Sequence, residues 1–448
     1  MTQPPKPAPR DGKITLAGYI HRFRADMLSA HPAKLYRAKM AEFRTPFFRS
    51  YMVNQPDLIR CVLRDRPMEF PKSDRVGAGL RPLLGNSVFL TNGETWLRQR
   101  RIIDPAFEGG RLRDTFPAML EAARATVARF VPGETEVEAH MSHAAADVIF
   151  RTLFSIPIED ETAQAVFHQF RAYQRSQPLV NLAAFLGPRW VPRLHGRRTR
   201  ASARAIRRLI LQMTTARKAQ IASGTAPDDL ATKIMTTRDP ETGETFDAAE
   251  MVDQVAIFFL AGHETSASAL AWALYLLAIS PEAQVRAAQE ADSFPDEPEF
   301  GDLKKLPFIR DVFREALRLY PPVPMMVRET TRPERFRNRD IPVGSQIVLS
   351  PWHLHRHSLY WSNPDGFDPD RYTTADGKAC LRDAFIPFSA GPRVCTGAGF
   401  AMAEAVLILA LILRRWRLDP VPGREPVPVA YLTVRAREGI WLRFSPRA

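Results

Sequence analysis

The chain has 448 residues, of which 45% are hydrophobic, which is enough for a large buried core. Its three cysteines, Cys61, Cys380 and Cys395, are odd in number and widely spaced, which argues against a disulfide framework and for a reducing compartment. The formal net charge of +13 favours an acidic protein partner, an anionic membrane surface or nucleic acid. We find no linker or repeat, so we predict a single domain over residues 1–448, with 1–45 as its N-terminal segment.

The N-terminal part of the chain begins without the apolar core of a signal peptide, which predicts a cytoplasmic protein. A strand is expected over Phe48–Val53, and Asn54–Asp57 then opens a helix that runs through Arg64. Helical periodicity dominates from Glu94 to Leu319.

The densest basic run extends from Arg189 to Arg217. It includes Arg193, Arg197, Arg198, Arg200, Arg204, Arg207 and Arg208, with an apolar stripe made by Ile206, Leu209, Ile210 and Met213. We interpret it mainly as a solvated amphipathic helix, with a specific binding surface as the alternative. No nucleic-acid-binding motif accompanies the charge, so we predict no nucleic acid partner, while peripheral contact with a membrane stays open.

The segment from Met251 to Ile279 is apolar enough to raise the question of a membrane span. Because the polar run Gly262–Thr265, which includes the charged Glu264, lies in its middle, we predict a long buried helix and no transmembrane segment. One face of this helix carries residues three and four positions apart, namely Phe258, Gly262, Thr265, Ala269 and Trp272.

The last third of the chain changes character. Residues Ile341–Leu349 predict a tight turn that leads into a strand, and Pro351–Pro387 is rich enough in Pro, Asp and Asn to predict ordered coil. A helix follows over Phe400–Trp416, and alternation in 431–434 and 440–442 predicts a terminal hairpin. The expected fold is therefore mainly α with small β-sheets.

Cys395 lies in the most informative segment, Pro387–Gly399, just before that helix. Backbone N–H groups and the helix dipole favour a thiolate there, and Gly391 and Gly397 leave room for a flat ligand. Arg393 can reach an anionic group on such a ligand. A buried structural cysteine is the alternative interpretation.

The pattern Phe-x-x-Gly-x-Arg-x-Cys-x-Gly is complete at Phe388, Gly391, Arg393, Cys395 and Gly397, and here the chain resembles the cytochrome P-450 superfamily, soluble bacterial type. The resemblance implies a long central helix over haem b, with Cys395 as the iron ligand. It also implies haem-propionate contacts from Trp96, Arg100 and Arg328 and a fold-holding triad of Glu315, Arg318 and Arg371.

The second motif of the family, Ala/Gly-Gly-x-x-Thr, is matched by Ala261, Gly262 and Thr265. The resemblance implies that Gly262 widens a groove for O2 and that Thr265 and Glu264 relay protons to it. The alternatives are a hydrogen bond from Thr265 to a carbonyl one turn earlier and a salt bridge for Glu264.

We therefore expect a monooxygenase that takes electrons from a separate ferredoxin and its reductase and hydroxylates a lipophilic molecule such as a fatty acid, terpenoid or carotenoid-like compound. A peroxide-driven peroxygenase and a haem sensor are the alternatives, which the Glu264–Thr265 pair disfavours. A monomer is expected. The predicted substrate pocket is lined by Ser87, Phe258, Phe259, Ala261, Met325, Met326, Leu432 and Thr433.

Overall fold

The computed structural model describes residues 2–447 except 11, 13, 45–48, 109, 177–195 and 431. These residues form two compact units: Met1–Phe70, Ala123–Ser142 and Thr265–Ala448 in unit 1, and Pro71–Ala122 and His143–Glu264 in unit 2. Helices α6 (Phe116–Ala128), α7 (Val137–Phe154) and α12 (Ala248–Ala278) carry residues of both units. The single domain expected from the sequence stays a prediction.

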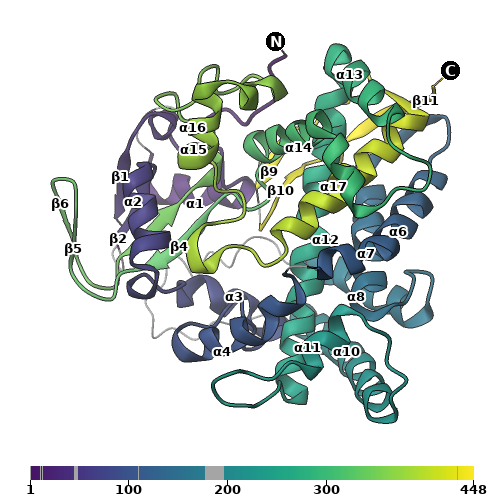
Figure 1. The fold of residues 1–448 in the computed structure, drawn as a ribbon. Helices are drawn as coiled ribbons and strands as arrows, with labels where there is room; N and C mark the ends of the chain where they lie inside the picture. The colour runs from purple at the N-terminus through teal and green to yellow at the C-terminus, as the bar shows by residue number, and fades with distance from the viewer. Residues whose placement is uncertain are drawn as a thin grey trace. The chain divides into compact units, whose positions relative to one another are not determined.

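The largest sheet of unit 1 has four strands in the order β1 (Met40–Arg44), β2 (Arg49–Val53), β7 (Gln346–Leu349) and β4 (Met326–Glu329). Strands β2 and β7 run parallel, while β1 and β4 pair antiparallel with their neighbours. A separate hairpin, β5 (Glu334–Phe336) and β6 (Arg339–Ile341), is drawn apart from that sheet in Figure 1. Tyr51, Val53, Ile347 and Leu349 contribute to a hydrophobic core from the paired strands.

Two smaller sheets complete unit 1. One joins β3 (Gly133–Glu136), β11 (Trp441–Pro446) and β8 (Trp416–Pro420), and the other pairs β9 (Pro428–Ala430) with β10 (Val434–Ala436). Helices α13 (Pro281–Asp292), α14 (Pro307–Leu319) and α17 (Ala398–Arg415) pack against one another (Figure 1). The remaining helices of the unit are α1 (Leu16–Ala25), α2 (Pro56–Arg60) with a π-helical continuation Cys61–Asp65, α15 (Pro351–Leu354) and α16 (Ala375–Asp383).

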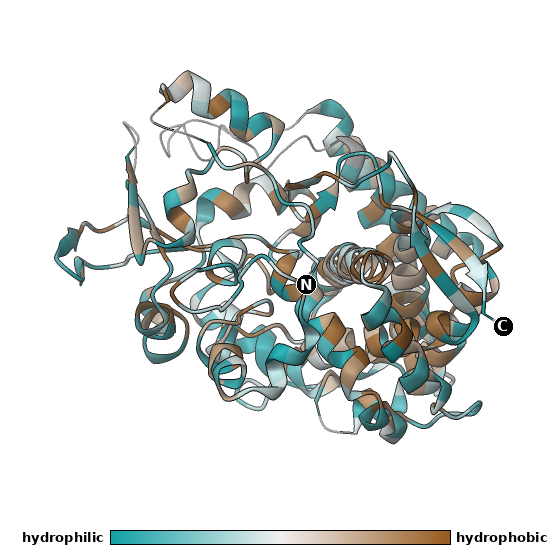
Figure 2. Cartoon of the chain, turned by 90° about the horizontal axis from the view of Figure 1, so that it is seen from above, coloured by the Kyte–Doolittle hydropathy of each residue, from teal (hydrophilic) through white to brown (hydrophobic). Residues whose placement is uncertain are grey.

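Unit 2 is helical. It contains α3 (Asp74–Leu84), α4 (Gly93–Ile103), α5 (Arg111–Asp114), α8 (Glu161–Ser176), α10 (Arg197–Ser223) and α11 (Leu230–Thr236). Helix α10 packs on α8 and on α3. In Figure 2 many helices carry hydrophobic residues along one side and hydrophilic residues along another, which is the pattern of helices that bury one face.

The expected fold class, mainly α with small sheets, is confirmed. Two local predictions were wrong. The 351–387 segment contains α15 and α16, because Ser350 and Thr374 cap them by accepting hydrogen bonds from the N–H groups of His353 and Gly377.

The predicted terminal hairpin does not form either. Strand β10 pairs with β9, and β11 pairs with β3 and β8, so the two segments belong to different sheets. Alternation along a strand indicates which residues share a face, but it does not identify the partner strand. Among the helices described, none has both the length and the apolar character needed to cross a membrane.

Candidate active site

Cys395 is displayed by a tight loop before α17, and its side chain is exposed. Ser389 and Gly391 adopt left-handed backbone conformations with φ of 64° and 66°, and the Cys395 N–H donates to the Phe388 carbonyl at 2.9 Å. A Cβ on Gly391 would lie 2.0 Å from the carbonyl oxygen of Leu63, so only glycine lets this loop pack there. Because the Cys395 side chain is exposed, the alternative interpretation as a buried structural cysteine does not fit this loop.

Arg393 and Arg328 are buried in unit 1, close enough for the charge of Arg393 to affect the pKa of Arg328. Arg393 donates to the carbonyls of Pro67 at 2.6 Å and Phe70 at 2.9 Å. Arg328, on β4, donates only a 3.2 Å bond to the Val327 carbonyl among the described residues, and its Nε has no hydrogen-bond partner. Burial, together with the charge of Arg393, lowers the pKa of Arg328 to about 10.

These features meet the requirements of a planar, anionic cofactor in unit 1. A Cβ built on Gly397 meets nothing within 4 Å, so this position beside the cysteine faces open space. The Arg328 Nε remains available to an acceptor, and a carboxylate would offset the cost of burying this cation. The exposed thiol, the open glycine and the buried cation therefore fit a haem with its propionates.

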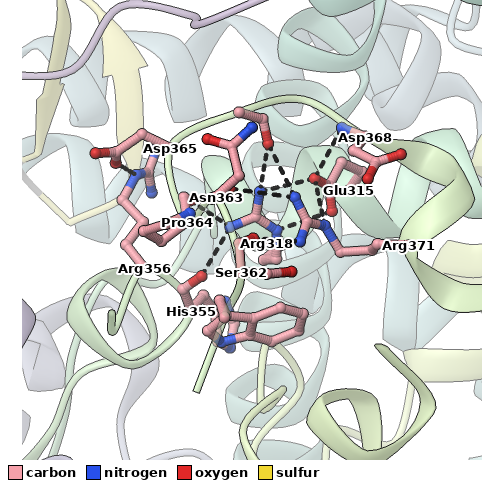
Figure 3. Close-up of polar contacts among 12 residues, drawn as sticks. Glu315, Arg318, His355, Arg356, Ser362, Asn363, Pro364, Asp365, Asp368 and Arg371 are labelled. Atoms are coloured by element: carbon pink, nitrogen blue, oxygen red, sulfur yellow. Dashed lines mark hydrogen bonds and ion pairs between the residues drawn. The ribbon is translucent and has the colours of Figure 1, made fainter. Parts of the chain in front are cut away.

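Glu315, Arg318 and Arg371 lie together in unit 1, completely buried or nearly so (Figure 3). Arg318 forms a two-pronged pair with the Glu315 carboxylate at 2.7 and 2.8 Å, and Arg371 Nε donates to the same carboxylate at 3.0 Å. Burial alone would raise the pKa of Glu315, but the two guanidinium groups outweigh it and lower the pKa.

The rest of this network consists mostly of backbone groups. Arg318 also donates to the carbonyls of His355, Pro364 and Gly366, so all five of its N–H groups have acceptors. Arg371 donates to the carbonyls of Ser362, Asn363 and Gly366. The network thus ties α14 to the irregular chain that follows α15.

After its exposed first turn, helix α12 is buried from Met251 to Ala278 except at one short stretch. Phe258, Gly262 and Thr265 are half-buried and Ala261 is exposed, whereas the residues before and after this short stretch are buried. These four residues recur at intervals of three and four and share one face. The buried carboxylate of Glu264 accepts a 3.1 Å hydrogen bond from Gln174 Nε2 on α8.

Gly262 has a packing reason to be glycine. A Cβ at this position would lie 2.7 Å from Cδ1 of Ile149 on α7, so the glycine lets the two helices of unit 2 approach closely. The role in O2 binding implied by the resemblance stays a prediction.

Trp96 and Arg100 lie one turn apart on α4 in unit 2. The Trp96 ring is buried, with Lys72 Nζ at 5.6 Å and the Arg100 guanidinium carbon at 5.8 Å from its centroid. Arg100 also pairs with Asp104 at 2.7 Å. The cation is thus held at one side of the indole ring and already has a carboxylate partner.

A family model described as Cytochrome P450 matches residues 7–440, almost the whole chain. The chain belongs to the cytochrome P450 family. It is 34% identical over 424 residues to the cyclooctat-9-en-7-ol 5-monooxygenase of Streptomyces melanosporofaciens, with 92% of this chain and 89% of the relative covered. Cyclooctatin synthase of the same organism is 31% identical, over 95% and 93% of the two chains.

A human protein is similar as well. Cytochrome P450 4A11 of Homo sapiens is 30% identical over 419 residues, which cover 87% of this chain and 78% of the human protein. The family assignment makes the protein a haem-thiolate monooxygenase, with haem b as its cofactor. The individual residue roles in this P450 rest on the geometry above.

The predicted pocket residues of this P450 differ in accessibility. Met325, Met326 and Leu432 are half-buried in unit 1, where Thr433 is buried and accepts a 3.3 Å hydrogen bond from Arg435 Nε. In unit 2, Ser87 is buried, and its hydroxyl has no hydrogen-bond partner in the described part of the chain.

Phe259 requires a correction. Its ring lies 4.6 Å from the ring of Phe150, 5.9 Å from Phe170 and 6.3 Å from Phe154, and only 3% of the residue is exposed. It therefore belongs to the aromatic core of unit 2 and does not line a pocket. Neighbouring Phe258 is the accessible one, because consecutive helical residues point about 100° apart.

Sequence analysis missed Glu404, which lies on α17 nine positions after the cysteine. The residue is 2% exposed, its Oε2 accepts a 2.9 Å hydrogen bond from the hydroxyl of Ser266, and its Oε1 has no partner. Burial raises its pKa to about 8, against the smaller effect of the Ser266 hydroxyl, so the carboxyl stays protonated at neutral pH. A lone glutamate in the apolar run Ala398–Leu413 was the available signal.

Proposed function

We propose that this P450 receives electrons from a separate ferredoxin and its reductase and hydroxylates a lipophilic small molecule, with Thr265 and Glu264 supplying protons. The observation that carries the proposal is the accessible face in the middle of α12, where a hydroxyl and three apolar or small residues interrupt an otherwise buried run from Met251 to Ala278. The net charge of +13 suits an acidic electron carrier.

The chain's own groups have separate tasks in this mechanism. When bound, haem supplies the iron at which O2 is reduced, and its thiolate ligand increases electron density there. Cys395 provides that thiolate from a loop held by the hydrogen bond from the Cys395 backbone N–H to the Phe388 carbonyl. Arg328 and Arg393 hold propionate oxygens, because buried guanidinium groups bind carboxylates strongly.

Protons are handled by α12. The Thr265 hydroxyl would hold a proton on the accessible face of α12, and the Glu264 carboxyl would resupply it. The Glu264 carboxylate lies one residue before Thr265 and accepts a 3.1 Å hydrogen bond from Gln174 Nε2. A general acid in such a position typically contributes a factor of ~10² to 10⁴ in rate.

An apolar substrate is supported by the residues that remain accessible. Phe258 and Ala261 in unit 2, and Met325, Met326 and Leu432 in unit 1, offer carbon and sulfur surface with no charge. The name of the first Streptomyces relative calls that protein a monooxygenase. The substrate in the name has an alkene and a single hydroxyl. We therefore favour a mostly hydrocarbon molecule that carries few polar groups.

A spectral screen tests the substrate class. Fatty acids, terpenoid alcohols, carotenoid-like compounds and steroids are added to the holoenzyme, and displacement of the iron-bound water is recorded as a Soret shift. We expect saturable shifts with at least one lipophilic class and none with sugars or amino acids of similar size. Saturable shifts with the polar compounds alone would reject a lipophilic substrate.

The proton route is tested with Thr265→Ala, once a substrate is known. We expect haem binding to be preserved and reductant still to be consumed, with most electrons leaving as hydrogen peroxide. Thr236→Ala, on an exposed position of α11, is the matched control and should leave coupling unchanged. Unchanged coupling in Thr265→Ala would reject the role, and peroxide-supported turnover above the ferredoxin-supported rate would favour a peroxygenase.

A further inference from the structure

Helix α10 has an unusual charge composition. Its 27 residues include eight cations and no carboxylate, although the whole chain has 62 basic and 49 acidic residues. The cations are Arg197, Arg198, Arg200, Arg204, Arg207, Arg208, Arg217 and Lys218. Of the basic run predicted from the sequence, Arg189 and Arg193 lie outside the described residues.

Two of the eight cations serve the fold of unit 2. Arg207 pairs with Asp253 at 2.6 Å and donates to the Leu83 carbonyl, and buried Arg217 pairs with Asp229 and donates to the Phe154 carbonyl. The other six have no ion pair or hydrogen bond to any residue that the structure describes, and all six are exposed. They therefore carry charge that folding does not use.

The unused cations are arranged in a line. With 3.6 residues per turn, five of them fall within a sector of about 80° on the helix, and exposed Leu211 falls within the same sector. This cationic stripe consists of Arg197, Arg200, Arg204, Arg208, Leu211 and Lys218. The opposite face is buried through Ile206, Ile210 and Met213.

The stripe is long and straight. From Arg197 to Lys218 it extends about 30 Å along the helix, at 1.5 Å per residue. Ala201 and Thr215, which are small and exposed, lie between its cations, so on the described face of α10 they do not hold a flat surface away from the charges. No aromatic side chain lies on α10, which argues against a platform for stacking nucleic acid bases.

We propose that the cationic stripe of α10 docks this protein on an anionic lipid bilayer. A bilayer presents a plane of negative headgroups that can meet all five cations at once, and Leu211 adds apolar surface at the contact. The helix itself is too polar to insert, so docking is peripheral and weakens as salt screens the charges. The inference does not depend on the substrate of the enzyme.

The test is co-sedimentation of the holoenzyme with vesicles of phosphatidylcholine alone or mixed with phosphatidylserine. The stripe variant combines Arg200→Ser, Arg204→Ser and Arg208→Ser. The control combines Arg335→Ser, Arg382→Ser and Arg417→Ser, which lowers the net charge equally at side chains that are 72%, 70% and 66% exposed. Circular dichroism and the haem spectrum report folding without reference to activity.

We expect wild-type protein to bind only the anionic vesicles, and less at high salt. Each stripe cation should contribute about fivefold, so the stripe variant should bind about 100-fold more weakly. The control should lose clearly less, because its cations are not aligned on one face. Equal binding to neutral vesicles, equal losses in the two variants, no vesicle binding at all, or tighter binding to RNA than to the anionic vesicles would each overturn the proposal.

Discussion

Two sets of buried arginines in unit 1, the pair Arg318 and Arg371 and the single residue Arg328, differ in their access to a carboxylate. Arg318 and Arg371 share the Glu315 carboxylate, and every N–H group of Arg318 has an acceptor (Figure 3). Arg328 is as well buried, yet among the described residues it meets no carboxylate and its Nε lacks a partner. Burying a cation without an anion is costly, so the first group is complete within the chain, whereas an anionic ligand would stabilise Arg328.

The pKa shifts follow this difference. Burial opposes the charge of both Arg318 and Arg328, but Glu315 overcomes it at Arg318 and raises the pKa, whereas the pKa of Arg328 falls to about 10. A haem propionate placed at Arg328 would supply the missing counter-charge. From this contrast we predict that Glu315, Arg318 and Arg371 hold the fold and that Arg328 binds the cofactor.

The largest expected effect comes from breaking the complete group. Glu315→Gln removes the shared carboxylate charge and leaves two guanidinium groups buried together, which should destabilise the protein by about 3–5 kcal/mol. Urea unfolding measures the loss. The control is Asp370→Asn, which removes the exposed pair with Arg286 and should cost less than about 1 kcal/mol. A loss at Glu315 no larger than the control would contradict the structural role.

Arg328→Leu sharpens the comparison from the other side. Arg328 is a buried cation without a carboxylate partner in the described residues. Removing it should therefore leave the unfolding free energy of the cofactor-free protein unchanged or higher. It should weaken haem binding about 10- to 100-fold, the loss typical of a cofactor's charged partner. Haem transfer to apomyoglobin measures the binding.

One outcome would contradict the proposed role of Arg328 in haem binding. If the variant lowers the stability of the cofactor-free protein as Glu315→Gln does, and haem affinity stays the same, then Arg328 belongs to the fold-holding group. Arg335→Leu, on an exposed residue of β5, is the matched control and should change neither quantity.

Glu404 extends the comparison to a buried acid and gives the smallest effect. The pKa of about 8 in the folded protein lies above the unfolded value of about 4.5, so the folded state holds a proton that the unfolded state releases. The contribution of this group to stability is therefore complete below pH 4.5 and is lost as the pH rises to about 8.

The matching variant is Glu404→Gln, which keeps the shape and removes the titration. Its stability relative to wild type should rise by about 2 kcal/mol between pH 6 and pH 8, close to the limit of about 1.4 kcal/mol per pH unit. Glu425→Gln, an exposed position, should show no such trend. A constant difference between Glu404→Gln and wild type across this pH range would mean that Glu404 is ionised in the folded protein.

Local signals in the sequence predicted the helices and the cysteine segment, and the family resemblance supplied the residues of the Glu315 network. They did not predict which strand pairs with β10, because that depends on contacts between distant segments. The orientation of Phe259 could not be read from its place in a uniformly apolar helix. The protonated state of Glu404 depends on burial by α12 and α17 together, which no short motif encodes.

Composition and periodicity did not separate the two groups of arginines, and only the family resemblance gave them different roles. Arg318 and Arg328 both look like ordinary cations near apolar residues, and only the folded chain shows which one finds a carboxylate. For the same reason the basic run could be interpreted as a solvated helix. Only the folded chain distinguishes Arg207 and Arg217, which pair with aspartates, from the exposed cations of the stripe.

The most direct test of the central claim is the spectrum of the dithionite-reduced protein under carbon monoxide. If Cys395 supplies the iron ligand, wild type and Cys380→Ser should show the long-wavelength Soret band of thiolate ligation, and Cys395→Ser should lose it. Retention of that band in Cys395→Ser would contradict the assignment.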